Sequence, residues 1–283
     1  MADNSGSRIE RGVSESIGFI LIFSIVMAGI GLVTLYGYPM LMSQQSNANE
    51  RIMEKNMIVL QNDLKSIVYK TVPYKESSLR VEGGSLTVYN TQSSPVISKI
   101  DINDCTGNPP YYVNAFQSGD LRYSSDSAAT DISLQDGAVV TRRHDEPGSA
   151  MLAEPRWFYD NQTNSMVINL IGFNSTGVFS RAGVGTVQME IGGTNYTYIS
   201  PVPSPLCIVY TPDPTPAPNG QDYSVAWDNY FMKILNNPPD ITVLRTGTPG
   251  TGGPLRYQLT VSNPVSNPMK LVIKKYDVII ASL

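Results

Sequence analysis

The feature that most constrains this chain is an uncharged run near its N-terminus. From Ile17 to Met42 the sequence contains no charged residue, whereas about 20 apolar residues in a helix are enough to cross the hydrocarbon layer of a bilayer. A cleaved secretory signal has a shorter apolar core, of about 7–15 residues, followed by a cleavage site with small residues. This run continues through "YGYPML" without such a site. We therefore expect a membrane-spanning helix that stays in the mature protein.

The charges on either side of this run predict its orientation. Arg8 and Arg11 precede it, and the first charged residues after it are Glu50 and Arg51. Positively charged residues next to a span favour the cytoplasmic side. We therefore expect a single-pass protein of the cell membrane, with a cytoplasmic N-terminus and an extracellular C-terminal domain.

The start of the span also resembles a known family. The stretch "RGVSESIGFILIFSIVMAGIGLV", Arg11 to Val33, resembles the N-terminus of archaeal type IV pilin-like proteins, which carry a class III signal peptide. The rest of the chain is more loosely similar to uncharacterised archaeal pilin-like proteins with a β-rich ectodomain. The resemblance implies that a prepilin peptidase cuts between Gly12 and Val13, directly after Arg11. The leader, residues 1–12, would be removed, and residues 13–42 would remain as the transmembrane helix.

The resemblance also implies an assembling helix. Bacterial-type pilins have Glu at the fifth position of the mature chain, whereas here Ile17 occupies that position and Glu15 is third. Ser24 and Ala28 have the small-x-x-x-small spacing that allows two apolar helices to approach closely. Glu15, Ser24 and Ala28 are therefore the expected assembly contacts, with copies of the chain or with other pilin-like subunits. An uncut signal anchor that does not assemble is the alternative.

A second helical pattern follows the span, over residues 43–73. Apolar residues recur there at intervals of four and three, as expected for one buried stripe on an amphipathic helix: Met53, Met57, Leu60, Leu64 and Ile67. Pro39 should kink or interrupt the helix before this stretch, and Pro73 should end it.

From residue 74 to 283 the pattern is typical of a β-rich extracellular domain. Three dipeptides, Gly83-Gly84, Asp136-Gly137 and Gly192-Gly193, lie between short alternating runs, which predicts three tight hairpins. The stretch "RWFYDNQTNSMVINLIGF" predicts two more strands around a polar turn. The expected fold class is α+β: a long N-terminal helix, then an antiparallel β-sandwich-like ectodomain with one short helix.

The C-terminal part contains the expected short helix. Residues 211–221 include "TPDPTPAPNGQ", which predicts an extended proline-rich loop. Aromatic and aliphatic residues at helical spacing then predict a helix over about residues 223–236, capped by Asp222 or Ser224. We expect its aromatic side chains to belong to the core. The stretches "LRYQLTVSNP" and "MKLVIKKYDVIIASL" predict two closing strands.

Few residues are candidates for chemistry. Cys105 and Cys207 both lie in the part expected outside the cell, where a disulfide between an early loop and a late strand is plausible and two buried thiols are the alternative. Asn161, Asn174 and Asn195 each begin an Asn-x-Thr glycosylation sequon.

Other classes of function are disfavoured. His144 is the only histidine, which excludes a His-rich metal site and leaves one candidate base for a catalytic triad. "DINDCTG" has Cys105 where an EF-hand needs an oxygen ligand, and "TRRHDEPGS" is typical of a solvated loop. A net charge of -4 gives no reason to expect nucleic acid. We therefore expect no enzyme activity, catalytic residue, metal or cofactor.

Together these patterns favour a pilin-like surface subunit that assembles through its N-terminal helix, into or beside a type IV pilus-like filament. Its β-domain would serve adhesion or another surface interaction. The alternative is a non-polymerising, membrane-anchored ectodomain that binds a ligand or a cell-wall component.

Overall fold

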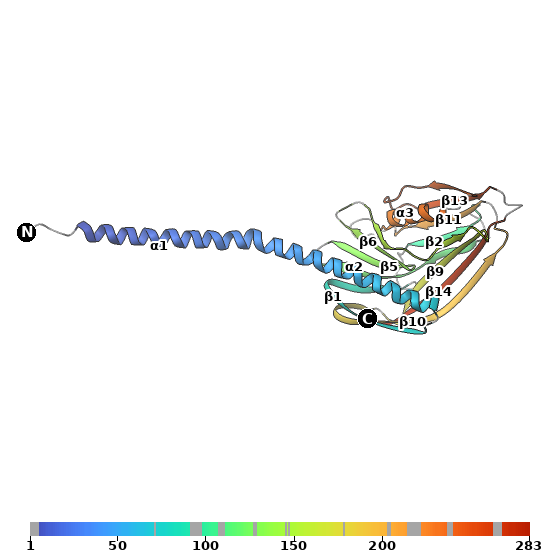
Figure 1. The fold of residues 1–283 in the computed structure, drawn as a ribbon, viewed down its shortest axis with the longest axis horizontal. Helices are drawn as coiled ribbons and strands as arrows, with labels where there is room; N and C mark the ends of the chain where they lie inside the picture. The colour runs from blue at the N-terminus through green and yellow to red at the C-terminus, as the bar shows by residue number, and fades with distance from the viewer. Residues whose placement is uncertain are drawn as a thin grey trace, which may run out of the picture. The chain divides into compact units, whose positions relative to one another are not determined.

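The computed structural model describes residues 6–70, 72–90, 98–106, 111–126, 129–144, 146, 148–177, 179–202, 205–213, 222–236, 240–262 and 268–283, with side chains from residue 16 onward. The chain divides into two compact units, Met1–Ala48 and Asn49–Leu283. Helix α2 begins in the first unit and ends in the second, and all the strands belong to the second (Figure 1).

The first unit is helical. It contains α1 (Gly6–Leu32), a π-helical segment η1 (Val33–Gly37) and the start of α2 (Tyr38–Lys70). The π-helical segment directly precedes Pro39, where the sequence predicts an interruption. Proline cannot donate a backbone hydrogen bond, and its ring clashes with the carbonyl four residues earlier. A wider turn, in which the Tyr38 N–H bonds to the Val33 carbonyl oxygen, lets the helix continue past Pro39 without a break.

In the second unit, α2 buries the predicted stripe. Met53, Met57, Leu60, Leu64 and Ile67 are all buried. The helix ends at Lys70, shortly before Pro73, as predicted. Strand β1 then begins at Tyr74, at the expected start of the β-rich domain.

A nine-stranded sheet forms the centre of the second unit. Its order is β7-β6-β5-β4-β1-β10-β14-β9-β8. The strands are β1 (Tyr74–Tyr89), β4 (Asp120–Ser125), β5 (Thr130–Gln135), β6 (Ala138–Arg143), β7 (Ala150–Ala153), β8 (Phe158–Asp160), β9 (Ser165–Ser175), β10 (Ser180–Ile199) and β14 (Lys270–Ser282). Neighbouring strands are antiparallel except β14 and β9, which pair in parallel from Lys270↔Ser165 to Ile280↔Ser175.

A five-stranded sheet and one short helix complete the unit. The smaller sheet has the order β12-β13-β11-β2-β3. Its strands are β2 (Lys99–Asn103), β3 (Tyr111–Gln117), β11 (Leu206–Thr211), β12 (Ile241–Thr246) and β13 (Leu255–Val261). Helix α3 (Ser224–Leu235) confirms the predicted short helix. Of the predicted proline-rich loop, Thr211 ends β11, and residues 214–221 lie outside the described part of the chain.

The cap of α3 differs by one position from the prediction. Tyr223 occupies the N-cap position, with no capping hydrogen bond from its side chain. The Asp222 carboxylate instead accepts hydrogen bonds from the backbone N–H groups of Ser224 (2.8 Å) and Gly252 (3.0 Å). The Ser224 hydroxyl accepts one from the Gly250 N–H (2.7 Å). Asp222 therefore fixes the start of α3 to the loop that precedes β13.

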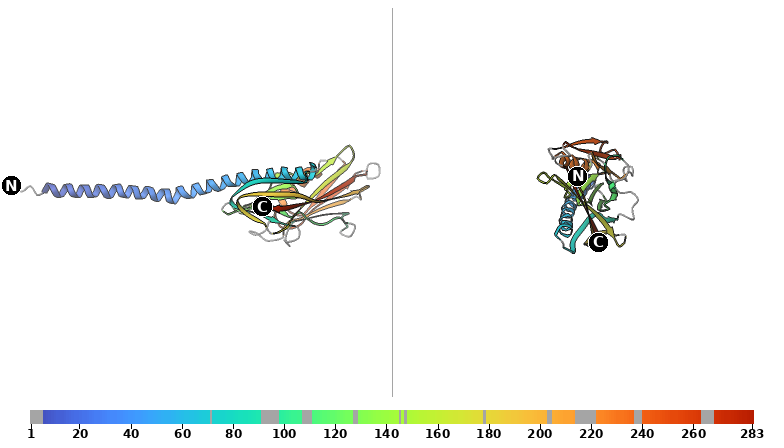
Figure 2. Two further views of the ribbon diagram at one scale, coloured as in Figure 1. Left: turned by 90° about the horizontal axis from the view of Figure 1, so that it is seen from below. Right: turned by 90° about the vertical axis from the view of Figure 1, so that its right-hand side faces the viewer.

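The larger sheet separates two hydrophobic cores. On β9, Ile168 and Leu170 belong to a core shared with the smaller sheet and α3. Ile171 and Phe173 belong to the other core, which α2 covers. Figure 2 shows this part of α2 lying along the strands of the larger sheet. Since successive side chains of a strand point to opposite faces, a sheet covered on both faces is apolar on both, and the fold is the predicted α+β class.

Two of the three predicted hairpins are wrong. Gly83 and Gly84 lie inside β1, where the register to β10 shifts between Val81 and Leu86. Gly83 has φ +66°, and a Cβ at Gly84 would overlap the Ser124 carbonyl oxygen of β4. These glycines therefore allow a bulge and a close approach between strands.

Gly192 and Gly193 likewise lie inside β10, where the register to β14 shifts between Ile191 and Gly193. A Cβ at Gly192 would lie 2.9 Å from Cδ1 of Ile279. Here too the glycines mark an irregularity within a long strand and not a turn.

The remaining hairpin prediction is confirmed. Asp136 and Gly137 have φ values of 48° and 74°, and Gln135 pairs with Ala138 at the ends of β5 and β6. Positive φ at both central residues is what a tight two-residue hairpin requires.

Candidate membrane and assembly site

The apolar side chains of the first unit are exposed along its helix. Ile17 is 58% exposed and Tyr36 is 73% exposed, and the large apolar residues between them are exposed to a similar degree. The most apolar window of the helix has a mean hydropathy of 2.5, and none of that window is buried. An exposed apolar surface of this extent needs a lipid or protein environment. The chain thus has one helix, among its described residues, that is long and apolar enough to cross a membrane.

Two polar side chains within this helix are satisfied locally. The Ser24 hydroxyl donates to the Ile20 carbonyl oxygen (2.7 Å), and the Thr34 hydroxyl donates to the Ile30 carbonyl oxygen (2.9 Å). Serine and threonine commonly bond back to the preceding turn in this way. A polar group without a partner is costly in hydrocarbon, so these two bonds make the helix compatible with a bilayer interior.

The residues predicted for processing and assembly all lie on α1. Arg11, Gly12, Val13 and Glu15 lie in the helix, but their side chains fall outside the described part of the structure, so processing stays a prediction. Ser24 and Ala28 are both exposed. They are four residues apart and therefore share one face of the helix. Their contact with a neighbouring helix stays a prediction.

Of the two alternatives for the cysteines, the structure shows the disulfide. Cys105 and Cys207 are bonded, with Cα atoms 4.9 Å apart and a sequence separation of 102. Cys105 follows the end of β2, and Cys207 pairs with Asn103 across β11 and β2. The bond therefore joins the segment after β2 to β11, and it constrains a long stretch of the unfolded chain.

The three sequons differ in their surroundings. Asn161 is exposed in the turn between β8 and β9, and the hydroxyl of Thr163 in the same sequon donates to Asp160 (2.6 Å). Asn195 is exposed on β10. Asn174 is half-buried on β9, where it pairs with Ile279. Asn161 and Asn195 are therefore the more accessible positions, while glycosylation itself stays a prediction.

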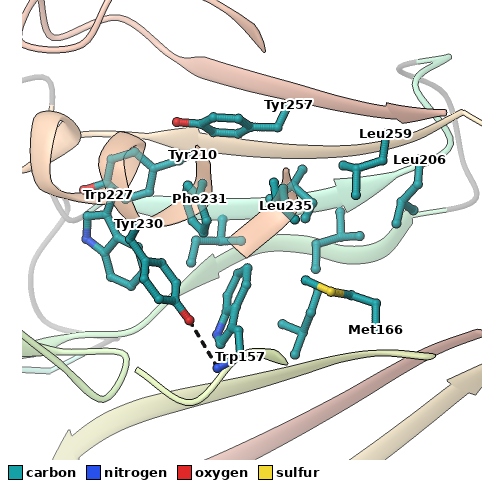
Figure 3. Packing of buried hydrophobic residues seen from close by; sticks show 14 of the residues in the cluster. Trp157, Met166, Leu206, Tyr210, Trp227, Tyr230, Phe231, Leu235, Tyr257 and Leu259 are labelled. Atoms are coloured by element: carbon teal, nitrogen blue, oxygen red, sulfur yellow. Dashed lines mark hydrogen bonds between the residues drawn. The ribbon is translucent and has the colours of Figure 1, made fainter. Parts of the chain in front are cut away.

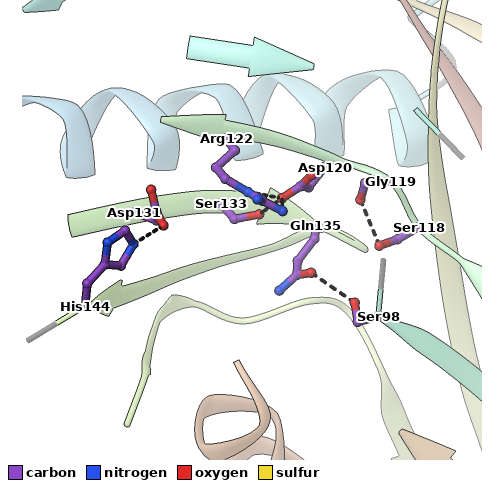
Figure 4. A network of polar contacts seen from close by, with 9 residues as sticks. All are labelled: Ser98, Ser118, Gly119, Asp120, Arg122, Asp131, Ser133, Gln135 and His144. Carbon is purple, nitrogen blue, oxygen red and sulfur yellow. Dashed lines mark hydrogen bonds and ion pairs between the residues drawn. The ribbon is translucent and has the colours of Figure 1, made fainter. Parts of the chain in front are cut away.

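His144 directly follows β6, and it lies beside polar contacts on β4 and β5 (Figure 4). Its Nε2 lies 2.5 Å from Oδ2 of the buried Asp131. Asp120 is also buried, and its Oδ2 accepts hydrogen bonds from Arg122 Nε (2.9 Å) and the Ser133 hydroxyl (2.7 Å). The buried Ser133 hydroxyl thus donates to Asp120 and not to His144. These contacts join β4 to β5, and β5 to the residue after β6. Among the described residues, they do not bring a serine hydroxyl to His144.

The aromatic residues of α3 belong to the core, as predicted (Figure 3). Trp227, Tyr230 and Phe231 are buried, with Tyr210 stacked on Trp227 at 5.7 Å between ring centroids. The Tyr230 hydroxyl accepts a hydrogen bond from the Trp157 backbone N–H (3.2 Å). The cluster therefore connects α3 to the segment that precedes β8.

One structural residue was missed by the sequence patterns. Gln61 is only 1% exposed, and its Nε2 donates to the carbonyl oxygens of Gly137 (2.7 Å) and Glu154 (2.9 Å). Gln61 lies beside Leu60 and Leu64 on the buried face of α2. Its position next to the apolar stripe is the sequence feature that could have predicted its burial.

Comparison with known proteins adds one finding. No curated protein matches the chain, and no solved structure matches it. A match does exist to a family described as a family of unknown function (DUF7289), over residues 11–197. This range starts at Arg11 and includes the apolar helix, α2 and most of the larger sheet. The chain belongs to this family, DUF7289.

Proposed function

We propose that this chain is a type IV pilin-like subunit of the cell surface. Its N-terminal helix would be processed by a prepilin peptidase and would assemble with copies of itself or with other pilin-like subunits. The β-domain would then be displayed for adhesion or another surface interaction. The chain would act by assembly and binding, without enzyme activity and without binding nucleic acid.

The observation that carries this proposal is the exposed, uncharged helix directly after Arg11-Gly12. Its side chains from Ile17 to Met42 include no charge, and its Ser24 and Thr34 hydroxyls are satisfied within the helix. Such a helix is stable in lipid, and it can also pack against identical helices when it leaves the lipid. The match to the family starts at Arg11, which makes this helix part of what its members share.

The proposed location follows from the charges around the span. Arg8 and Arg11 before it favour a cytoplasmic N-terminus, which would place Asn49–Leu283 outside the cell. The Cys105–Cys207 disulfide supports an extracellular location for this unit, because disulfides persist in oxidising surroundings and are rare in the cytosol.

The test is the N-terminus of the mature protein. We expect the protein extracted from membranes of its native cells to begin at Val13, as read by N-terminal sequencing. A Gly12→Leu variant should remain uncut, because the residue before the cleavage point is changed. A Gly18→Leu variant, changed inside the span, should still begin at Val13. Wild-type protein that begins at Met1 or Ala2 would contradict processing and favour the uncut anchor.

A further inference from the structure

A pocket lies beside the last turns of α2, within the second unit. Its volume is about 650 Å³, and its lining includes Lys65, Tyr69, Lys70 and Arg156. Pockets that bind small molecules commonly measure about 300–1,000 Å³. One wall comes from the helix, and the other comes from the segment Pro155 to Trp157 between β7 and β8. The pocket has the size of a ligand site.

The second wall is fixed by hydrogen bonds. The Tyr230 hydroxyl contacts the Pro155 carbonyl oxygen (3.3 Å), and the Asn169 side-chain amide donates to the Arg156 carbonyl oxygen. The Trp157 indole N–H donates to the Asn169 carbonyl oxygen (2.9 Å). A wall that is held by the core in the free protein loses little conformational entropy on binding.

The pocket gathers positive charge on a chain whose net charge is -4. Lys65, Lys70 and Arg156 all line it. Among the described residues, no carboxylate lies within ion-pair distance of these three cations. Burial, and then the charge of Arg156, lower the pKa of Lys65, while the charge of Glu154 raises it. Lys65 and Arg156 therefore repel each other, and an anion between them would relieve that repulsion.

Glu154 and Asp63 have partners outside the pocket. Glu154 contacts Lys233, with Oε1 and Nζ 2.5 Å apart. Asp63 on α2 contacts Lys75 (3.3 Å) and accepts a hydrogen bond from the Ser77 hydroxyl (2.5 Å). The charge of Glu154 still acts on Lys65 from a distance, but neither acid forms an ion pair with Lys65, Lys70 or Arg156.

An aromatic ring lies among these cations. Tyr69 is half-buried, and the Arg156 guanidinium lies 5.0 Å from its ring centroid. The Tyr276 ring packs edge-on against it at 5.8 Å, which fixes its orientation. Asn62 and Ser66 add an amide and a hydroxyl to the lining. Cations beside an aromatic ring with neutral hydrogen-bonding groups suit a polar ring that carries an oxyanion.

We propose that this pocket binds an acidic saccharide of one or two sugar units, with its carboxylate or sulfate held by Lys65, Lys70 and Arg156 and a sugar ring against Tyr69. The proposal deepens the proposed function by naming a ligand class for the displayed domain. Its test uses protein that has not assembled, so failure here leaves cleavage at Gly12 unaffected, and failure of cleavage leaves binding unaffected.

The test is calorimetric titration of the full chain in a non-ionic detergent. We expect digalacturonate to bind, with an affinity that falls as salt is raised, since salt screens the cations. The neutral disaccharide maltose should bind at least about tenfold more weakly, because it lacks the charge-assisted bonds. Inorganic sulfate and inorganic phosphate should compete with digalacturonate but should each bind more weakly, because neither ion carries a sugar ring.

Two variants and a matched control assign binding to this pocket. Lys65→Gln and Arg156→Gln should each weaken digalacturonate binding about tenfold or more, because each removes a charged donor. Lys55→Gln removes the same charge from an exposed position of α2 outside the pocket, and its affinity should equal that of the wild type.

Three outcomes would overturn the proposal. Maltose binding as tightly as digalacturonate would contradict recognition of the charge. Sulfate or phosphate binding as tightly as digalacturonate would contradict recognition of the sugar. Unchanged affinity in both pocket variants would place any binding elsewhere on the protein.

Discussion

At the scale of single residues, Asp136 is a carboxyl group that the fold buries in a tight turn. It occupies the hairpin between β5 and β6 and is only 1% exposed. Its Oδ1 accepts a hydrogen bond from the Ile171 N–H (2.7 Å), while Oδ2 is buried with no partner among the described residues. Burial raises the pKa of Asp136 well above its usual value, although the bond to Ile171 lowers it. The carboxyl therefore binds a proton more tightly in the folded than in the unfolded chain.

This raised pKa predicts how stability changes with pH. Between the unfolded pKa of an aspartate, about 3.9, and the higher folded pKa, the folded chain holds more protons, so the contribution of Asp136 falls as pH rises. Asp136→Asn removes this loss of stability at higher pH, because asparagine does not ionise. The variant keeps an oxygen that can accept the Ile171 N–H, and Asn-Gly is a favoured hairpin dipeptide. We expect Asp136→Asn to raise Tm relative to wild type by more at pH 7 than at pH 4, with both proteins in one non-ionic detergent.

Nearby tyrosines do not contribute to this pH dependence. Burial raises the pKa of Tyr69 and of Tyr230, so both are neutral across this pH range. Asp126→Asn, on an exposed residue, is the control and should change Tm by the same small amount at both pH values. A Tm difference for Asp136→Asn that is equal at pH 4 and pH 7 would show that Asp136 ionises normally in the fold.

At the scale of elements, Gln61 attaches α2 to the larger sheet. Its side-chain amide bonds to two carbonyl oxygens that follow β5 and β7, those of Gly137 and Glu154. Gln61→Leu keeps the bulk but removes the donor, and leaving a buried acceptor unsatisfied costs about 1–3 kcal/mol. We expect the free energy of unfolding to fall by that amount in urea titrations followed by near-ultraviolet circular dichroism.

The control for this prediction is the adjacent amide. Asn62 is exposed on α2, so Asn62→Leu should change the free energy of unfolding by no more than about 0.5 kcal/mol. Equal losses in the two variants would mean that the bonds from Gln61 do not hold the helix to the sheet.

Local patterns predicted the helices better than the strand connections. The spacing of Met53, Met57 and Leu60 depends only on the geometry of one helix, and it correctly identified the buried face of α2. Gly83-Gly84 and Asp136-Gly137 both look like turns in sequence, yet only the second is one. Gly83-Gly84 lies within a strand because β4 and β10, from distant parts of the chain, pair with β1 on either side. The sequence around the two glycines does not reveal these partners.

At the scale of the whole molecule, the sequence predicted that a long helix precedes a β-rich domain, and it left the Cys105–Cys207 bond as one of two alternatives. It did not predict that β9 and β14 pair in parallel, since that pairing joins segments far apart in the chain. The pocket was missed for the same reason. Lys65 and Lys70 look like solvated charges on a helix, and Arg156 like part of a loop, until the fold brings them together.

In the proposed function, the N-terminal helix assembles through its apolar surface. Ile25 is 64% exposed in the middle of the uncharged run. A filament core built from such helices would have neither lipid nor water to receive a charge, and an unpaired buried charge costs several kcal/mol there. Insertion into the membrane is less sensitive, because a central charge costs only about 2.5–3.5 kcal/mol on insertion scales.

The most direct measurement compares membrane and sheared-filament fractions from native cells that carry wild-type, Ile25→Glu or Ile25→Leu protein. We predict that wild-type and Ile25→Leu protein occur in both fractions. Ile25→Glu protein should reach the membrane but be absent from filaments. If wild-type protein is itself absent from filaments and stays monomeric in mild detergent, assembly is contradicted, and a membrane-anchored binding domain that does not polymerise becomes the better account.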